Sequence, residues 1–61
     1  MTTFTIEELI LCARRELGYR KRVYPRLIRD NKMSKEIADS EIALMRAIRE
    51  NLENQQQLKL L

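Results

Sequence analysis

Apolar residues recur at helical spacing in two stretches of this chain, and polar residues fill most positions between them. In the first stretch the apolar positions follow one face of a helix: Ile6, Leu9, Ile10, Ala13, Leu17, Tyr24, Leu27 and Ile28. In the second stretch the corresponding positions are Ile37, Ala38, Ile42, Leu44, Met45, Ile48 and Leu52. Because no strand-like alternation is present, the pattern predicts an all-α protein.

Capping residues mark where the two predicted helices begin. Thr5 and Glu8 fit a capping box that opens a helix over about residues 6–29, and Ser34 is a typical N-cap for a helix over about residues 35–54. Residues 30–34 are the predicted linker, and residues 55–61 are expected to fray because they do not extend the apolar pattern. A linker this short joins antiparallel neighbours, so the predicted fold is a helical hairpin in one small domain, residues 1–61.

Pro25 interrupts the first predicted helix. A proline inside a helix removes one hydrogen bond and disfavours helical geometry at the residue before it, here Tyr24. The apolar pattern nevertheless continues in phase through Leu27 and Ile28, which favours a kinked helix. The alternative is a break at Tyr24, followed by a short helix that has Pro25 in its first turn.

One charged residue falls inside each apolar pattern, Arg20 in the first and Glu41 in the second. An unpaired charge on a buried helix face is costly, so we expect the two faces to meet and these residues to form a structural ion pair. Tyr24, on the same face as Arg20, is close enough in the sequence for its hydroxyl to join them. In the alternative, each charge reaches solvent at the edge of its apolar face.

The small size of the chain favours self-association. A chain of 61 residues seldom folds on its own core, and the usual aids are disulfides, a metal or a partner chain. The single cysteine, Cys12, and the absence of histidine exclude an internal disulfide and a zinc site, so we expect no metal and no cofactor. Two hairpins are expected to form a homodimer with four helices. Residues that flank the apolar faces are candidates for its surface: Leu11, Val23, Ile42 and Leu44.

Positive charge is concentrated in the middle of the chain. Between Arg14 and Lys35 lie nine basic residues against Glu16 and Asp30, a net charge of +7, whereas each flank is net −2. On a helical wheel most of these residues cluster away from the apolar face. We call this cluster the basic surface: Arg14, Arg15, Lys21, Arg22, Arg26, Arg29 and Lys32. It is consistent with plain solvation, with binding to an acidic protein, or with contacts to nucleic-acid phosphates.

The sequence does not favour enzymes or membrane proteins. It has no histidine, no glycine-rich phosphate loop and no carboxylate pair with an obvious pocket. No apolar run approaches the roughly 20 residues that a membrane-spanning helix needs. Glu7 and Glu8 stand where a signal peptide would carry positive charge, so we expect an intracellular protein.

Three further segments stand out in the sequence: Arg20-Lys21-Arg22-Val23-Tyr24-Pro25-Arg26-Leu27, Lys32-Met33-Ser34 and Glu41-Ile42-Ala43-Leu44-Met45-Arg46-Ala47-Ile48. Together they resemble small uncharacterised proteins encoded by temperate, lambda-like phages and prophages. The resemblance covers roughly residues 7–50 and includes an Arg-Val-Tyr-Pro element. It implies an accessory protein in the cytoplasm of the infected bacterial host that modulates a host process. It brings no established activity and no known binding residues.

Overall fold

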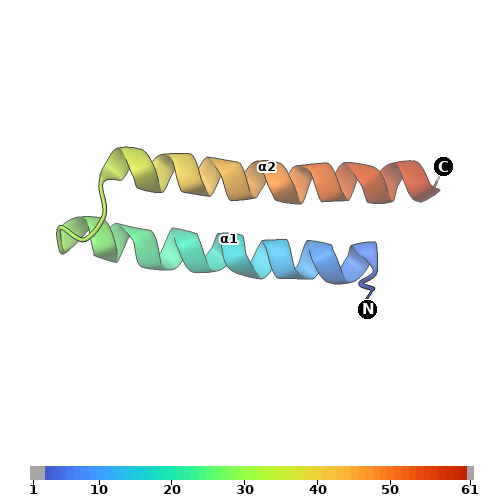
Figure 1. Ribbon diagram of the computed structural model, residues 1–61, viewed down its shortest axis with the longest axis horizontal. Helices are drawn as coiled ribbons and strands as arrows, with labels where there is room; N and C mark the ends of the chain where they lie inside the picture. Colours follow the sequence, from blue (N-terminus) through green and yellow to red (C-terminus); the bar gives the residue numbers. More distant parts are fainter. Residues whose placement is uncertain (1–2, 61) are drawn as a thin grey trace.

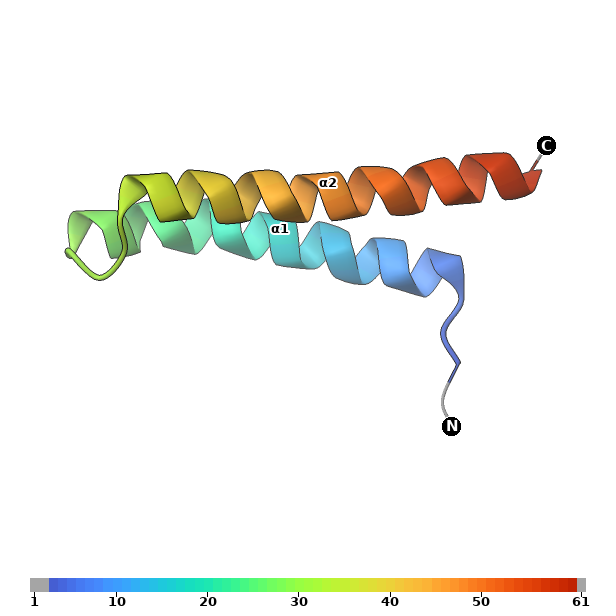
Figure 2. The same ribbon diagram turned by 45° about the horizontal axis from the view of Figure 1, so that its top comes forward.

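The protein is a hairpin of two antiparallel helices, as the sequence predicts. The computed structural model describes residues 3–60. Helix α1 spans Ile6–Arg29 and helix α2 spans Lys35–Leu60. Figures 1 and 2 show the helices side by side along their length, with the start of α1 and the end of α2 at the same end of the molecule. The hairpin measures 45 × 24 × 17 Å, so nearly every residue lies close to the surface.

Both helices begin at the predicted caps. The Thr5 hydroxyl accepts a hydrogen bond from the Glu8 backbone N–H at 3.1 Å, and the Glu8 carboxylate accepts one from the Thr5 backbone N–H at 3.1 Å. This is the reciprocal capping box. At the start of α2 the Ser34 hydroxyl accepts from the Ile37 backbone N–H at 3.1 Å. Each cap satisfies backbone donors that have no partner within the helix.

A left-handed residue, Asn31, ends α1 and turns the chain toward α2. Its φ of 61° lies in a region that asparagine enters more readily than most residues. The backbone N–H of Asn31 donates to the Ile28 carbonyl, and that of Lys32 donates to the Leu27 carbonyl at 2.8 Å. These two bonds form a Schellman motif, which closes the helix and leaves two further residues, Met33 and Ser34, before α2 begins at Lys35.

Helix α1 runs without interruption through Pro25 to Arg29. The predicted alternative of a break at Tyr24 is therefore wrong, and the in-phase apolar pattern was the better guide. Tyr24, Leu27 and Ile28 are all half-buried, so the turn that contains the proline still packs against the rest of the hairpin. This packing compensates for the hydrogen bond that proline cannot donate.

Helix α2 continues to Leu60, beyond the predicted end near residue 54. The expectation that residues 55–61 fray is wrong for residues 55–60, and residue 61 lies outside the described residues. Glutamine, leucine and lysine are good helix formers, and no glycine or proline interrupts the segment. Gln56 is also half-buried, so the helix retains some packing one turn beyond Leu52.

The core is small and lies along the line where the helices meet. Its buried members are Ile10, Ala13, Leu17 and Ala38. In α2, Met45 and Leu52 are half-buried, whereas Ile37, Leu44 and Ile48 are exposed although the sequence places them in the apolar pattern. The apolar residues of α2 therefore cover two neighbouring faces, and only one of these faces packs against α1.

Candidate interaction surfaces

Arg20 links the two helices through the main chain of Glu41. Its Nη1 donates to the Glu41 backbone carbonyl at 2.8 Å and lies 3.4 Å from the Glu41 carboxylate. Its Nε donates to the Glu16 carboxylate at 3.0 Å within α1. The hydrogen bond to Glu16 is the main reason why the pKa of Arg20 is raised above its ordinary value. We call these three residues the Arg20 network.

The Arg20 network lies at the edge of the packed face. The Arg20 side chain is 19% exposed and that of Glu41 is 44% exposed, so neither charge is enclosed by apolar residues. Tyr24 is half-buried one turn away. Among residues 3–60 its hydroxyl forms no hydrogen bond to the ion pair, but Tyr24 is near enough to be a further cause, after the hydrogen bond to Glu16, of the raised pKa of Arg20.

A second ion pair crosses between the helices on the opposite side. Nη2 of Arg14 lies 2.6 Å from the Glu53 carboxylate, a contact that the sequence analysis missed. This hydrogen bond lowers the pKa of Glu53 below its ordinary value of 4.5. Arg49, one turn from Glu53, places its Nε 3.4 Å from the same carboxylate without a hydrogen bond, and that Nε is buried.

The two crossing pairs define the two sides of the hairpin. Arg14 and Arg20 are six residues apart, which separates them by about 120° around α1 at 3.6 residues per turn. Glu41 and Glu53 are twelve residues apart, which gives the same separation around α2. The side marked by Arg14 and Glu53 also carries the exposed charged residues Lys21, Asp39 and Arg46.

The side marked by the Arg20 network is apolar. In α1, three apolar residues lie at offsets of −7, +3 and +7 from Glu16: they are Leu9, Tyr19 and Val23. In α2, three apolar residues lie at offsets of −4, +3 and +7 from Glu41: they are Ile37, Leu44 and Ile48. Residues at these offsets share one helix face. All are exposed except Val23, which is half-buried. We call these six residues the lateral apolar surface.

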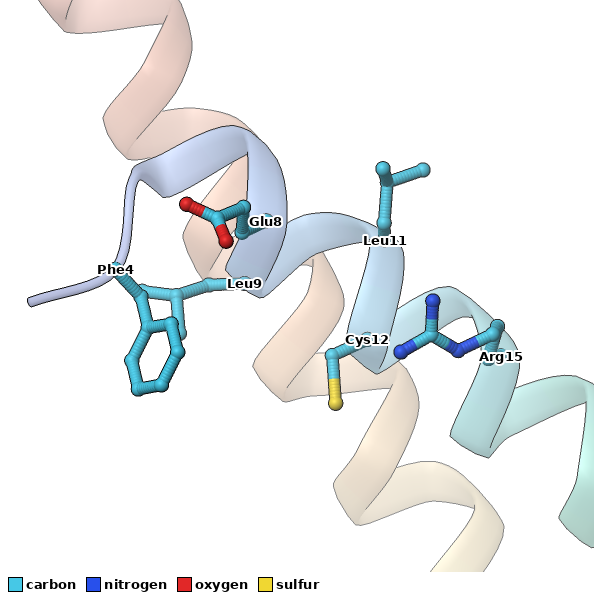
Figure 3. A pocket seen from close by; sticks show the side chains of 6 residues that line it. All are labelled: Phe4, Glu8, Leu9, Leu11, Cys12 and Arg15. Carbon is cyan, nitrogen blue, oxygen red and sulfur yellow. The ribbon is translucent and has the colours of Figure 1, made fainter. Parts of the chain in front are cut away.

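A shallow groove of about 330 Å³ continues this surface at the start of α1. Figure 3 shows Phe4 and Leu9 side by side, with the sulfur of Cys12 pointing to the same side and the Arg15 side chain beyond it. The Cys12 thiol is exposed. Leu9 belongs to both the groove and the lateral apolar surface, so the exposed apolar area extends to the first turns of α1.

The residues predicted as a dimer surface do not lie together. Val23 and Leu44 belong to the lateral apolar surface. Leu11 is exposed but falls four residues before Arg15, on the outer face of α1. Ile42 is half-buried and lies next to the core position Ala38, at i+4. The sequence alone did not separate these faces, because each residue only flanks an apolar position.

The seven residues of the basic surface are all exposed. Arg15, Arg22, Arg26 and Arg29 recur at offsets of seven, four and three, which places them along the outer face of α1, away from α2. Arg14 and Lys21 lie toward the side of the Arg14–Glu53 pair. Among residues 3–60, only Arg14 of the seven forms an ion pair within 4.0 Å. The outer face thus presents four unneutralised guanidinium groups in a row.

Within residues 3–60 no group of three histidine, cysteine or acidic side chains is arranged to hold a metal ion. Neither described helix combines the length and the apolar character that crossing a membrane requires. Comparison of the chain with protein-family models, curated proteins and solved structures finds no match.

Proposed function

We propose that this chain is a non-enzymatic accessory protein of a temperate phage, acting in the cytoplasm of the infected host by binding another protein. The observation that carries the proposal is the row formed by Arg15, Arg22, Arg26 and Arg29 on the outer face of α1. An acidic protein surface is the partner that such a row fits, because complementary charge steers association and fixes orientation. The resemblance of residues 7–50 to phage-encoded proteins supports modulation of a host process.

The proposal includes a homodimer in which two hairpins form a four-helix arrangement. Its support is the large number of exposed apolar side chains beside only four buried residues in the described part of the chain. Dimerisation places these side chains against each other, while the outer face of α1 stays available to the partner.

The test is affinity capture from bacterial lysate with a charge-reversed variant. The wild-type chain is expected to retain a defined host protein with an acidic surface, and the double variant Arg22→Glu/Arg26→Glu is expected to lose it. The control is Arg46→Glu/Lys59→Glu, which makes the same change in net charge at exposed positions of α2. Retention by all three proteins, or by none, contradicts the proposal.

The alternative is a nucleic-acid-binding regulator. The observation that favours it is Tyr19, exposed at the border of the basic surface, three residues before Arg22 and four after Arg15. Exposed aromatic rings beside guanidinium groups stack on bases in single-stranded nucleic-acid complexes. Retardation of a DNA or RNA oligonucleotide at low salt that weakens steeply as salt rises supports this alternative, and the absence of a shift at low salt excludes it.

A further inference from the structure

The solvent-accessible surface of the hairpin is larger than that of a compact folded protein of the same mass. A compact folded protein of 7.3 kDa exposes about 4,200 Å². This chain exposes 5043 Å². The excess of roughly 850 Å² is close to the ~800 Å² that each partner contributes to a standard protein–protein interface. The monomeric hairpin therefore exposes more surface than a compact protein of the same mass, by about the area that one partner buries in a standard interface.

Five of the eight large apolar side chains that are exposed in the described part of the chain lie on one side; the other three are Phe4, Leu11 and Leu58. Five residues of the lateral apolar surface are between 40% and 57% exposed: Leu9, Tyr19, Ile37, Leu44 and Ile48. They come from both helices and lie on either side of the line where α1 and α2 meet. Such a surface, made by two neighbouring helices, is what pairs of helices present to each other in four-helix bundles.

Charge favours a second copy on this side over the outer face of α1. The charged groups at the centre of the lateral apolar surface are Glu16, Arg20 and Glu41, with a net charge of −1. The whole chain is +3, and its outer α1 face carries a row of arginines, so contact between two copies across that face is repelled. Apposing the lateral apolar surfaces keeps the two arginine rows apart and leaves both exposed.

We propose that two copies of this chain pack through their lateral apolar surfaces, with the Arg20 network in the centre of the interface. The inference specifies the homodimer included in the proposed function and rests on it for that point. A two-fold axis through this surface brings each Leu44 and Ile48 against apolar side chains of the other copy. The partly exposed carboxylates of Glu16 and Glu41 lose water on association, so they restrict the ways in which the copies fit together.

Sedimentation over a concentration series tests the proposal with matched variants. The wild-type chain is expected to be dimeric in the micromolar range. Leu44→Glu/Ile48→Glu is expected to be monomeric, whereas the control Ala43→Glu/Ala47→Glu adds the same charges at adjacent exposed positions and stays dimeric. A wild-type chain that is monomeric and fully helical overturns the proposal. The same holds if both variants remain dimeric or both become monomeric.

A second measurement avoids variants, in case the Leu44 and Ile48 substitutions also unfold the chain. In a mixture of isotope-labelled and unlabelled wild-type protein, isotope-filtered NMR is expected to show contacts between copies at the methyl groups of Leu44 and Ile48. Contacts between copies at Ala43 and Ala47 instead overturn the proposal. Arg22→Glu/Arg26→Glu leaves this side unchanged, so this variant is expected to lose the acidic partner and stay dimeric. A wild-type chain that captures the partner but is monomeric contradicts the interface alone, and one that is dimeric but captures no partner contradicts the proposed function alone.

Discussion

The guanidinium of Arg20 is closer to the main chain of Glu41 than to its side chain. Nη1 lies 2.8 Å from the Glu41 carbonyl oxygen and 3.4 Å from the carboxylate. A contact to a backbone carbonyl holds the register of the two helices whatever the charge on the side chain. The contacts of Arg20 with Glu16 and Glu41 should therefore differ in how much each contributes to the free energy of unfolding.

Removal of the Arg20 charge is expected to cost more than removal of the Glu41 charge. Arg20→Gln loses three contacts and should lower the free energy of unfolding by about 1 kcal/mol. Glu41→Gln keeps the carbonyl contact, and its cost should be about half of that or less, in line with partly exposed ion pairs. Double-mutant cycles by urea denaturation at one protein concentration should give a larger coupling of Arg20 to Glu16 than to Glu41. A larger coupling to Glu41 contradicts this order.

Acid is expected to weaken the Arg14–Glu53 contact. Because hydrogen bonding to Arg14 holds the pKa of Glu53 below 4.5, the folded state binds fewer protons there than the unfolded state. This contribution is present in full above pH 4.5, the ordinary pKa of the group, and is lost as the pH falls through the lowered value. Arg14→Gln should flatten the dependence of thermal stability on pH in that acidic range. An unchanged slope argues against a role for this pair.

Gly18→Ala is expected to stabilise the hairpin. An added Cβ meets no atom within 4 Å apart from the adjoining residues and backbone of its own helix, and Gly18 does not have a positive φ. Alanine in the middle of a helix is more favourable than glycine by about 1 kcal/mol. The melting temperature by circular dichroism should rise. A fall would show that Gly18 allows a close contact which the monomeric hairpin does not contain.

Pro25→Ala is also expected to stabilise α1. Alanine restores the backbone N–H in the middle of the helix and removes the clash of the proline ring, a gain of up to about 3 kcal/mol. Pro25 is exposed, so the substitution removes little packing. Urea denaturation should show a higher midpoint with an unchanged slope. If stability falls, the proline is needed for the path of α1 near the turn.

The left-handed turn residue gives a prediction about the linker. Asn31→Val is expected to destabilise the hairpin by about 1–2 kcal/mol, because a β-branched residue is strained at positive φ. Asn31→Gly should be neutral or slightly stabilising, because glycine adopts this conformation freely. Chemical denaturation of the two variants provides the comparison. Equal stability of both would show that the turn adopts another conformation in solution.

The sequence contained the local signals for the fold. Thr5 and Ser34 act through hydrogen bonds to residues three positions away, so their roles can be read from the chain alone. The fold-back followed from the short linker, and the charges inside the two apolar patterns pointed to the contact between Arg20 and Glu41. The resemblance to phage proteins and the partner class stay predictions.

Features that depend on the angular position of each helix were not available from the sequence. Ile37, Leu44 and Ile48 belong to the apolar pattern of α2, yet the packed face is the neighbouring one, formed by Ala38 and Met45. In the sequence, the apolar residues of two adjacent helix faces form one continuous pattern, so the face that packs against α1 cannot be told from its neighbour. The Arg14–Glu53 pair joins residues 39 positions apart, and only the relative rotation of the two helices brings them together.

The first turn of α1 and the last turn of α2 sit at one end of the hairpin (Figure 1). The two copies in the proposed dimer can therefore be encoded in tandem with a flexible Gly/Ser connector, which would convert the proposed pairing between molecules into pairing within one chain at millimolar effective concentration. Such a fusion would stay assembled on dilution and would allow one half to be mutated while the other remained native.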